Sequence, residues 1–132
     1  INTPSLLSFS DLEICLDTYQ KSGSLKENNK ICEENKKIID SWLEHNIYLE
    51  KFSKDKSFDA ITPSFLIPNK EINLEKVHNF LKINKIAFDI RNYKKAPKGI
   101  RIWTGPTIKK KDLIALTNWL DWSFKNINDI QL

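Results

Sequence analysis

Methionine is absent from this chain of 132 residues, and glycine occurs only three times. Because no initiator methionine precedes Ile1, we expect the chain to be a piece of a longer polypeptide. No run of about 18 apolar residues occurs, so no membrane-spanning segment is predicted. The first residues also lack the basic and apolar regions of a signal peptide. The sequence therefore predicts a cytoplasmic protein without a membrane partner.

Cysteine and histidine are equally scarce, with two residues of each type. Their wide separation gives no zinc-binding spacing, so no metal site is predicted. Cys15 and Cys32 stand among apolar neighbours in helical patterns, which favours two buried, reduced thiols; a disulfide between neighbouring helices is the alternative. His45 and His78 are isolated, and no glycine-rich phosphate loop occurs. The chain is therefore not expected to contain a complete active site of its own.

Arginine is rare although the chain is basic, with a net charge of +4. Of the 21 basic residues only Arg91 and Arg101 are arginine, which leaves nineteen lysines. In so lysine-rich a chain, a lysine says little about function. An arginine supplies a planar two-pronged donor that lysine cannot replace, and this singles out Arg101.

The apolar residues, 40% of the chain, recur in patterns that predict four helices and four strands. The helices are expected over residues 10–23, 24–46, 74–84 and 110–127, and the strands over residues 48–52, 64–68, 87–93 and 100–104. This order is typical of an α+β fold, with a small antiparallel or mixed sheet of three to four strands covered by helices.

The residues around Arg101 form the strongest candidate site. The predicted strand at 100–104 places Ile100 and Ile102 on one face and Arg101 on the other. Tyr93 and Lys94 precede it in a basic loop bounded by proline and glycine. A guanidinium in that position can grip a carboxylate or a phosphate, although a solvated surface arginine is the simpler alternative.

Two other segments admit a binding function. Asn2 and Thr3, beside a proline, could donate to an anion, but such residues equally serve as turns and caps. The run of three lysines at 109–111, together with four tryptophans, could bind single-stranded nucleic acid. Three of those tryptophans fall in predicted helices, where core or interface packing explains them. No nucleic-acid partner is therefore predicted.

Several segments resemble the C-terminal end of phosphoserine aminotransferases. They are GIRIWTGPT at residues 99–107, LTNWLDW at 116–122, INTPSLL at 1–7 and DIRNYKKAP at 89–97. The segments occur in the family's order and span nearly the whole chain.

The resemblance implies a class V, fold-type I aminotransferase that uses pyridoxal 5'-phosphate (PLP) and works as a homodimer. Such an enzyme transfers the amino group of glutamate to 3-phosphohydroxypyruvate, giving phosphoserine and 2-oxoglutarate in serine biosynthesis. Residues 1–23 would then be a segment and helix leading from a large domain that the chain lacks, and residues 24–132 the C-terminal small domain.

The resemblance also assigns roles to the candidate residues. Arg101 stands where the family binds the substrate α-carboxylate, and Tyr93 and Lys94 fall in the loop that contacts the substrate phosphate. Asn2 and Thr3 resemble residues that bind the cofactor phosphate of the partner subunit. The lysine that forms the Schiff base lies upstream of this chain in the family, so the isolated chain is expected to be inactive. The alternative is a non-catalytic module of this fold that binds a small anion or a protein.

Overall fold

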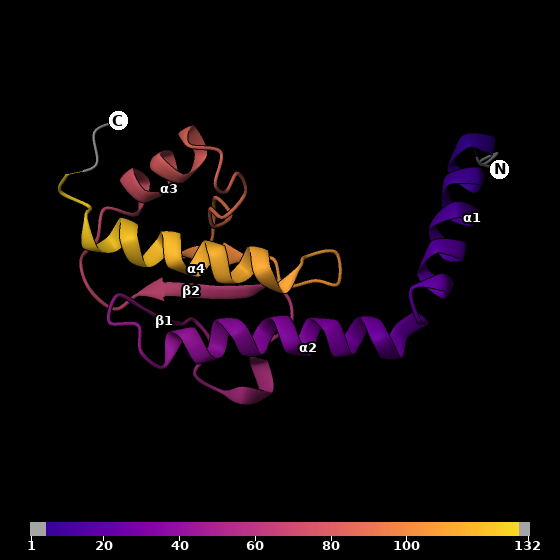
Figure 1. Ribbon diagram of the computed structural model, residues 1–132, viewed down its shortest axis with the longest axis horizontal. Helices are drawn as coiled ribbons and strands as arrows, with labels where there is room; N and C mark the ends of the chain where they lie inside the picture. The colour runs from indigo at the N-terminus through magenta and orange to yellow at the C-terminus, as the bar shows by residue number, and fades with distance from the viewer. Residues whose placement is uncertain (1–4, 130–132) are drawn as a thin grey trace.

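A computed structural model describes residues 5–129, which form four helices and a small sheet, with the first helix projecting away from the rest (Figure 1). The helices are α1 (Leu6–Lys21), α2 (Ser24–Leu43), α3 (Leu74–Ile83) and α4 (Lys110–Lys125), and a 3-10 turn, η1, spans Lys56–Phe58. The strands are β1 (Leu49–Lys51), β2 (Ser64–Pro68) and β3 (Ile100–Ile102).

The strands form one antiparallel sheet in the order β1-β2-β3. In its register Leu66 lies opposite Ile100, and Phe65 lies opposite Arg101. Successive strand residues point to opposite faces, so Arg101 shares a face with Phe65 and not with the isoleucines that flank it. The prediction for the faces of β3 is confirmed, because Ile100 and Ile102 are both buried.

The core forms where the helices cover the face of the sheet that carries Leu66, Ile100 and Ile102. α2 and α4 run side by side in the same direction across the molecule (Figure 1). α2 contributes Ile39, and α4 contributes residues that recur at helical spacing, namely Leu113, Leu120 and Phe124. Burial of these side chains is the main favourable contribution to the fold.

The third helix, α3, closes the core beside α4. Asn73 caps it, as predicted, by accepting a hydrogen bond from the backbone N–H of Lys76 through its side chain. Val77 and Leu81 face inward and are completely buried. The amphipathic pattern therefore fixes both the start of this helix and the face that it buries.

The first helix, α1, extends away from this core and buries none of its residues (Figure 1). The predicted start at Ser10 is wrong, since the helix begins at Leu6 after Ser5. The predicted end is confirmed: Gly23 has φ 95°, a left-handed conformation that glycine adopts readily. Cys15 is exposed on α1, which corrects the expectation of two buried thiols, whereas Cys32 is buried and both thiols are free.

The strand predicted at residues 87–93 is absent from the described fold. One isolated bridge joins Arg91 to Ile100, and the N–H of Arg101 donates to the carbonyl of Ile90. Only Ile90 of this segment is buried. A single buried side chain gives the alternating pattern too little apolar surface to hold a regular strand, so the segment lies as a loop along β3.

The fold is the predicted small α+β domain, with three strands where three to four were expected. No helix among residues 5–129 is long and apolar enough to cross a membrane.

Candidate anion-binding site

The Arg101 side chain lies on the face of β3 away from the core, yet only 16% of it is exposed. Its Nε is buried and has no hydrogen-bond partner among the described residues. The two terminal nitrogens, Nη1 and Nη2, are the donors that have partners. The Nε side of the guanidinium is therefore buried, and hydrogen bonds form at its terminal edge, which consists of Nη1 and Nη2.

Two side chains from the preceding loop occupy that edge. Nη2 of Arg101 donates to Oδ2 of Asp89 at 2.7 Å, and Nη1 donates to the hydroxyl of Tyr93 at 3.1 Å. The Tyr93 ring also lies against the guanidinium, with 4.6 Å between its centroid and Cζ. Such a cation–π contact orients the positive group without neutralising its charge. Arg101 thus has one anionic partner and one aromatic support.

The loop that carries Tyr93 is shaped by its own hydrogen bonds. Asn92 donates from its side chain to the carbonyls of Tyr93 and Ala96, both at 3.1 Å. The N–H of Ala96 closes a turn onto the carbonyl of Tyr93 at 2.9 Å. This turn holds Tyr93 beside Arg101 although the segment has no ladder of strand hydrogen bonds.

Gly99 allows β3 to approach β2 closely just before Arg101. A Cβ atom at this position would lie 2.3 Å from the carbonyl oxygen of Leu66 and 3.0 Å from the Phe65 ring. Any other residue would therefore push the start of β3 away from its neighbour. The glycine fixes the depth at which Arg101 is set into the sheet.

The chain after β3 is held from two directions. Asn35 of α2 is completely buried, and its side-chain amide donates to the carbonyls of Gly105 at 3.2 Å and Ile108 at 3.0 Å. Thr104, also buried, donates from its hydroxyl to the carbonyl of Ile61 at 2.8 Å. These contacts anchor the connection from β3 to α4.

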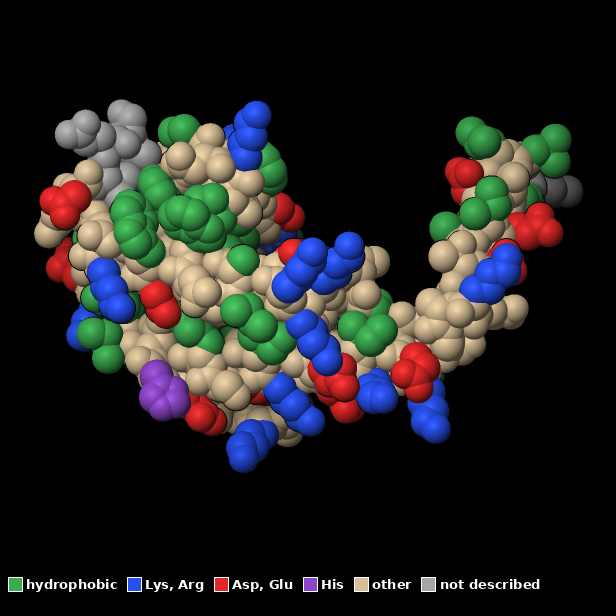
Figure 2. All heavy atoms as spheres, viewed as in Figure 1, with side chains coloured by type: hydrophobic (Ala, Val, Ile, Leu, Met, Phe, Trp, Pro, Cys, Tyr) green, Lys and Arg blue, Asp and Glu red, His purple; other side chains and the backbone are tan. Residues whose placement is uncertain are grey.

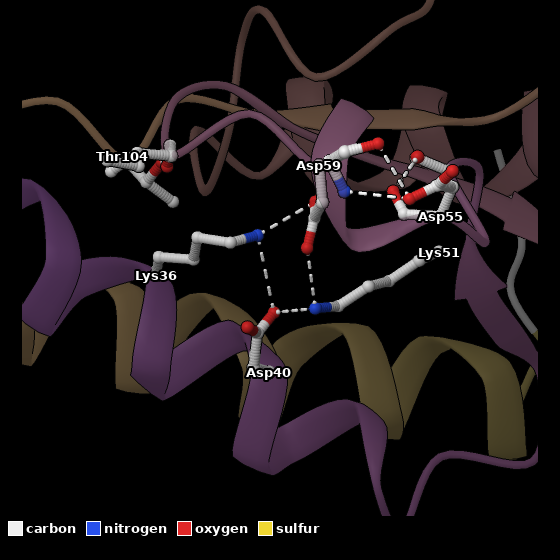
Figure 3. Close-up of polar contacts among 9 residues, drawn as sticks. Lys36, Asp40, Lys51, Asp55, Asp59 and Thr104 are labelled. Carbon is white, nitrogen blue, oxygen red and sulfur yellow. Dashed lines mark hydrogen bonds and ion pairs between the residues drawn. The ribbon is translucent and has the colours of Figure 1, made fainter.

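The segment that contains Ile61 is itself tied to α2 by a cluster of four ion-paired residues (Figure 3). Asp59 pairs with Lys36 and with Lys51, each at 2.9 Å. Lys51 also reaches Asp40 at 2.8 Å. Two lysines and two aspartates balance their charges, so this cluster is a structural clamp and has no spare charge for a ligand.

The clamp also shifts the pKa values of Asp59 and Lys51. Burial alone would raise the pKa of Asp59, but the hydrogen bonds and charges of Lys51 and Lys36 outweigh it and hold that pKa below its usual value. Burial likewise opposes the charged form of Lys51, while Asp40 and Asp59 raise its pKa above the ordinary value. Both shifts favour the charged forms, the carboxylate of Asp59 and the ammonium group of Lys51.

The structure brings some of the predicted site residues together and separates others. Tyr93, one of the candidate residues, contacts Arg101. Lys94 is exposed in the same loop and forms no hydrogen bond or ion pair with another described residue. Asn2 and Thr3 lie outside the described residues.

Sequence reasoning missed Asp89 and Asn35. The usable signal for Asp89 was its charge, opposite to that of Arg101, in a segment predicted to pair with the strand of Arg101. Asn35 gave no local signal, because its partners lie 70 and 73 residues further along the chain.

The three tryptophans that lie in helices make packing or hydrogen-bond contacts. Trp42 is half-buried and donates from its indole to Asp121 at 3.0 Å. Trp119 and Trp122 pack with Phe80 of α3 in a cluster that is partly exposed, on the face of α4 seen as a green patch in Figure 2. In the lysine run, Lys110 pairs with Glu34 at 2.7 Å.

This geometry can bind an anion and hold it in a fixed plane. A carboxylate is flat and can accept two parallel hydrogen bonds from the terminal edge of a guanidinium. Arg101 presents that edge from a rigid strand, with an aromatic ring as support. Among residues 5–129, no group of three or more His, Cys, Asp or Glu side chains is placed to hold a metal ion.

Two known proteins are similar to this chain over nearly all of its length. Over 125 residues the chain is 32% identical to the phosphoserine aminotransferase of Methanosarcina mazei and 30% identical to that of Methanosarcina barkeri. Each match covers 94% of this chain and 34% of the relative, so the chain spans about a third of the length of these proteins. No protein-family model matches the chain. The resemblance read from the sequence motifs is confirmed, and the chain is related over nearly its whole length to the phosphoserine aminotransferase family.

Proposed function

We propose that this chain is the C-terminal part of a phosphoserine aminotransferase and that Arg101 binds the α-carboxylate of its substrates. The proposal rests on the surroundings of Arg101. Its side chain is mostly buried, the Tyr93 ring packs on its guanidinium, and its terminal nitrogen Nη2 donates to the carboxylate of Asp89. The relatives' name supplies an amino transfer that involves phosphoserine. The resemblance implies that glutamate is the amino donor when phosphoserine is formed, and that phosphoserine is the donor in the reverse reaction.

In this proposal the cofactor, PLP, is held mainly by parts of the enzyme outside the described residues. All nineteen lysines lie within residues 5–129, and all but Lys36, Lys51 and Lys76 are exposed. Lys36 and Lys51 belong to the four-residue clamp, and Lys76 donates to the carbonyl of Asn128. In the proposal no lysine of this chain binds the cofactor covalently, and no chemical step is assigned to the described residues.

The work of this chain is then to position the substrate. A bidentate contact between Arg101 and the α-carboxylate would fix the plane of the amino acid relative to the reacting carbon. Tyr93, packed on the guanidinium, would limit its rotation. Lys94 would supply positive charge for the substrate phosphate from the exposed part of the loop. Asn2 and Thr3 would contact the cofactor phosphate of a partner subunit in a homodimer.

The exposure of α1 supports the proposed division at residue 23. All its described residues are exposed, including Leu6, Phe9, Leu12 and Leu16. Apolar side chains on a helix normally pack against another element. In the proposal, α1 leads from a large domain and is covered by it, while residues 24–132 form the small domain.

The central test is an Arg101→Lys substitution in the full-length enzyme. Lysine keeps the charge but cannot form the planar two-point contact. Steady-state kinetics are expected to show higher KM values for glutamate and phosphoserine, equivalent to about 1–3 kcal/mol of lost charge-assisted hydrogen bonding. Arg91→Lys is the matched control, because Arg91 is more exposed and pairs with Glu75. Unchanged KM values for Arg101→Lys would contradict the assignment.

The second candidate is a non-catalytic module that binds a small anion or a protein, which the guanidinium of Arg101 would also permit once Asp89 is displaced. The coding sequence upstream of Ile1 distinguishes the two. An enzyme requires about 200–250 further residues, the size of a large domain, that include the cofactor lysine. A reading frame that starts near Ile1 favours the module.

A further inference from the structure

The partner of Arg101 is itself a carboxylate. Asp89 Oδ2 lies 2.7 Å from Nη2, the distance of a charge-assisted hydrogen bond. A substrate carboxylate that binds the terminal edge of the guanidinium needs Nη1 and Nη2 together. It would therefore have to take Nη2 from Asp89 and Nη1 from the hydroxyl of Tyr93.

The two members of this ion pair are held very differently. Only 16% of the Arg101 side chain is exposed, whereas 84% of the Asp89 side chain is exposed. The arginine is fixed by the strand and by Tyr93, while the aspartate reaches it from a loop without regular structure. Because Asp89 can be rehydrated almost completely on leaving, its displacement costs little and needs no movement of β3.

The contact made by Asp89 is also weaker in kind than the one it would give way to. It uses one carboxylate oxygen on one guanidinium nitrogen, so it is monodentate. An incoming carboxylate that accepts from both terminal nitrogens makes two parallel bonds. The geometry therefore allows exchange in favour of a ligand carboxylate and disfavours anions that offer a single acceptor.

We propose that Asp89 is an internal competitor for Arg101, a displaceable carboxylate that holds the guanidinium in place between substrates and sets how strongly a substrate carboxylate binds. This inference rests on the proposed function of Arg101. Asp89 is thus a specificity-determining residue that has to leave the guanidinium before the substrate occupies it. Only molecules in which Asp89 is off the guanidinium can bind a carboxylate, so the apparent affinity is the intrinsic affinity multiplied by the fraction of such molecules.

The experiment measures binding of glutarate to the full-length enzyme by isothermal titration calorimetry. Glutarate carries two carboxylates and no amino group, so it can occupy the site without reacting. Asp89→Asn leaves a neutral side chain that competes poorly, and we expect the dissociation constant to fall about twofold to fivefold, the range that an exposed ion pair accounts for. The KM for glutamate is expected to fall by a similar factor.

Two variants separate this role from a general effect of charge or folding. Asp89→Glu restores a competing carboxylate and is expected to return the dissociation constant toward the wild-type value. Glu75→Gln removes the same charge from the neighbouring pair with Arg91 and is expected to leave glutarate binding unchanged.

Each contrary outcome has a distinct meaning. Unchanged or weaker glutarate binding in Asp89→Asn, with Arg101→Lys still weakening it, would show that Asp89 only orients the arginine and would overturn the inference alone. If Arg101→Lys leaves glutarate binding intact, the proposed function of Arg101 fails as well.

Discussion

Among single residues, Asn35 connects the packing of the domain to the strand that carries Arg101. Its buried amide donates to two carbonyls of the connection between β3 and α4, that of the buried Gly105 and that of the half-buried Ile108. Asn35→Ala leaves those carbonyls without a donor and is expected to lower the free energy of unfolding by about 1–3 kcal/mol. Urea denaturation measures the change. Asn29→Ala, at an exposed position of the same helix, is the control for helix propensity.

His78 makes stability depend on pH. Burial lowers its pKa, the positive charge of Arg91 lowers it further, and Glu75 only partly offsets them. The folded state thus binds a proton less readily than the unfolded state, so stability is complete above the unfolded pKa of about 6.5 and is lost as pH falls through the folded pKa.

Thermal unfolding at pH 7.5 and at pH 5 tests this prediction. The wild-type chain is expected to lose stability on acidification, and His78→Gln is expected to lose less of it. The exposed His45→Gln variant serves as the control and should behave as the wild type does. Equal losses in His78→Gln and the wild type would show that His78 is not responsible.

Among the helices and strands, α1 is the helix that buries none of its residues against the rest of the described structure. Helices of about 12–15 residues or fewer are marginal in water, and α1, with 16 residues, lies close to that limit with no buried side chain. When the chain is produced alone, we expect it to self-associate through the apolar residues of α1. Sedimentation velocity over a range of concentrations should show this, and Leu12→Glu combined with Leu16→Glu should reduce it.

The control for this prediction is Phe58→Ser, which removes an even more exposed apolar side chain from η1. It is expected to leave the association unchanged. A wild-type chain that remains monomeric at every concentration would contradict the requirement for a cover on α1.

Local patterns predicted the elements whose stability is local. The cap at Asn73, the apolar stripe of α4 and the alternation of Ile100 and Ile102 each depend on neighbours within a few positions, and each is confirmed. The segment at residues 87–93 has the same alternation but buries one residue, so long-range packing decided its form. The contacts of Asn35 span 70 and 73 residues, and the contact of Asp89 with Arg101 spans 12, so neither follows from the periodicity of a single element.

For the molecule as a whole, the described structure combines a packed α+β body with one helix that reaches out from it (Figure 1). The body sets Arg101 at a fixed depth through Gly99, Asn35 and the clamp of lysines and aspartates. The projecting helix buries none of its residues, and in the proposed function a large domain covers it. Both features agree with a chain that spans about a third of its relatives' length.

The proposed binding of the substrate carboxylate by Arg101 is tested most directly by a crystal structure of the full-length protein with bound glutamate. We expect both terminal nitrogens of Arg101 to contact the α-carboxylate and Asp89 to have moved off the guanidinium into solvent. A structure in which glutamate is bound elsewhere while Asp89 still pairs with Arg101 would contradict it.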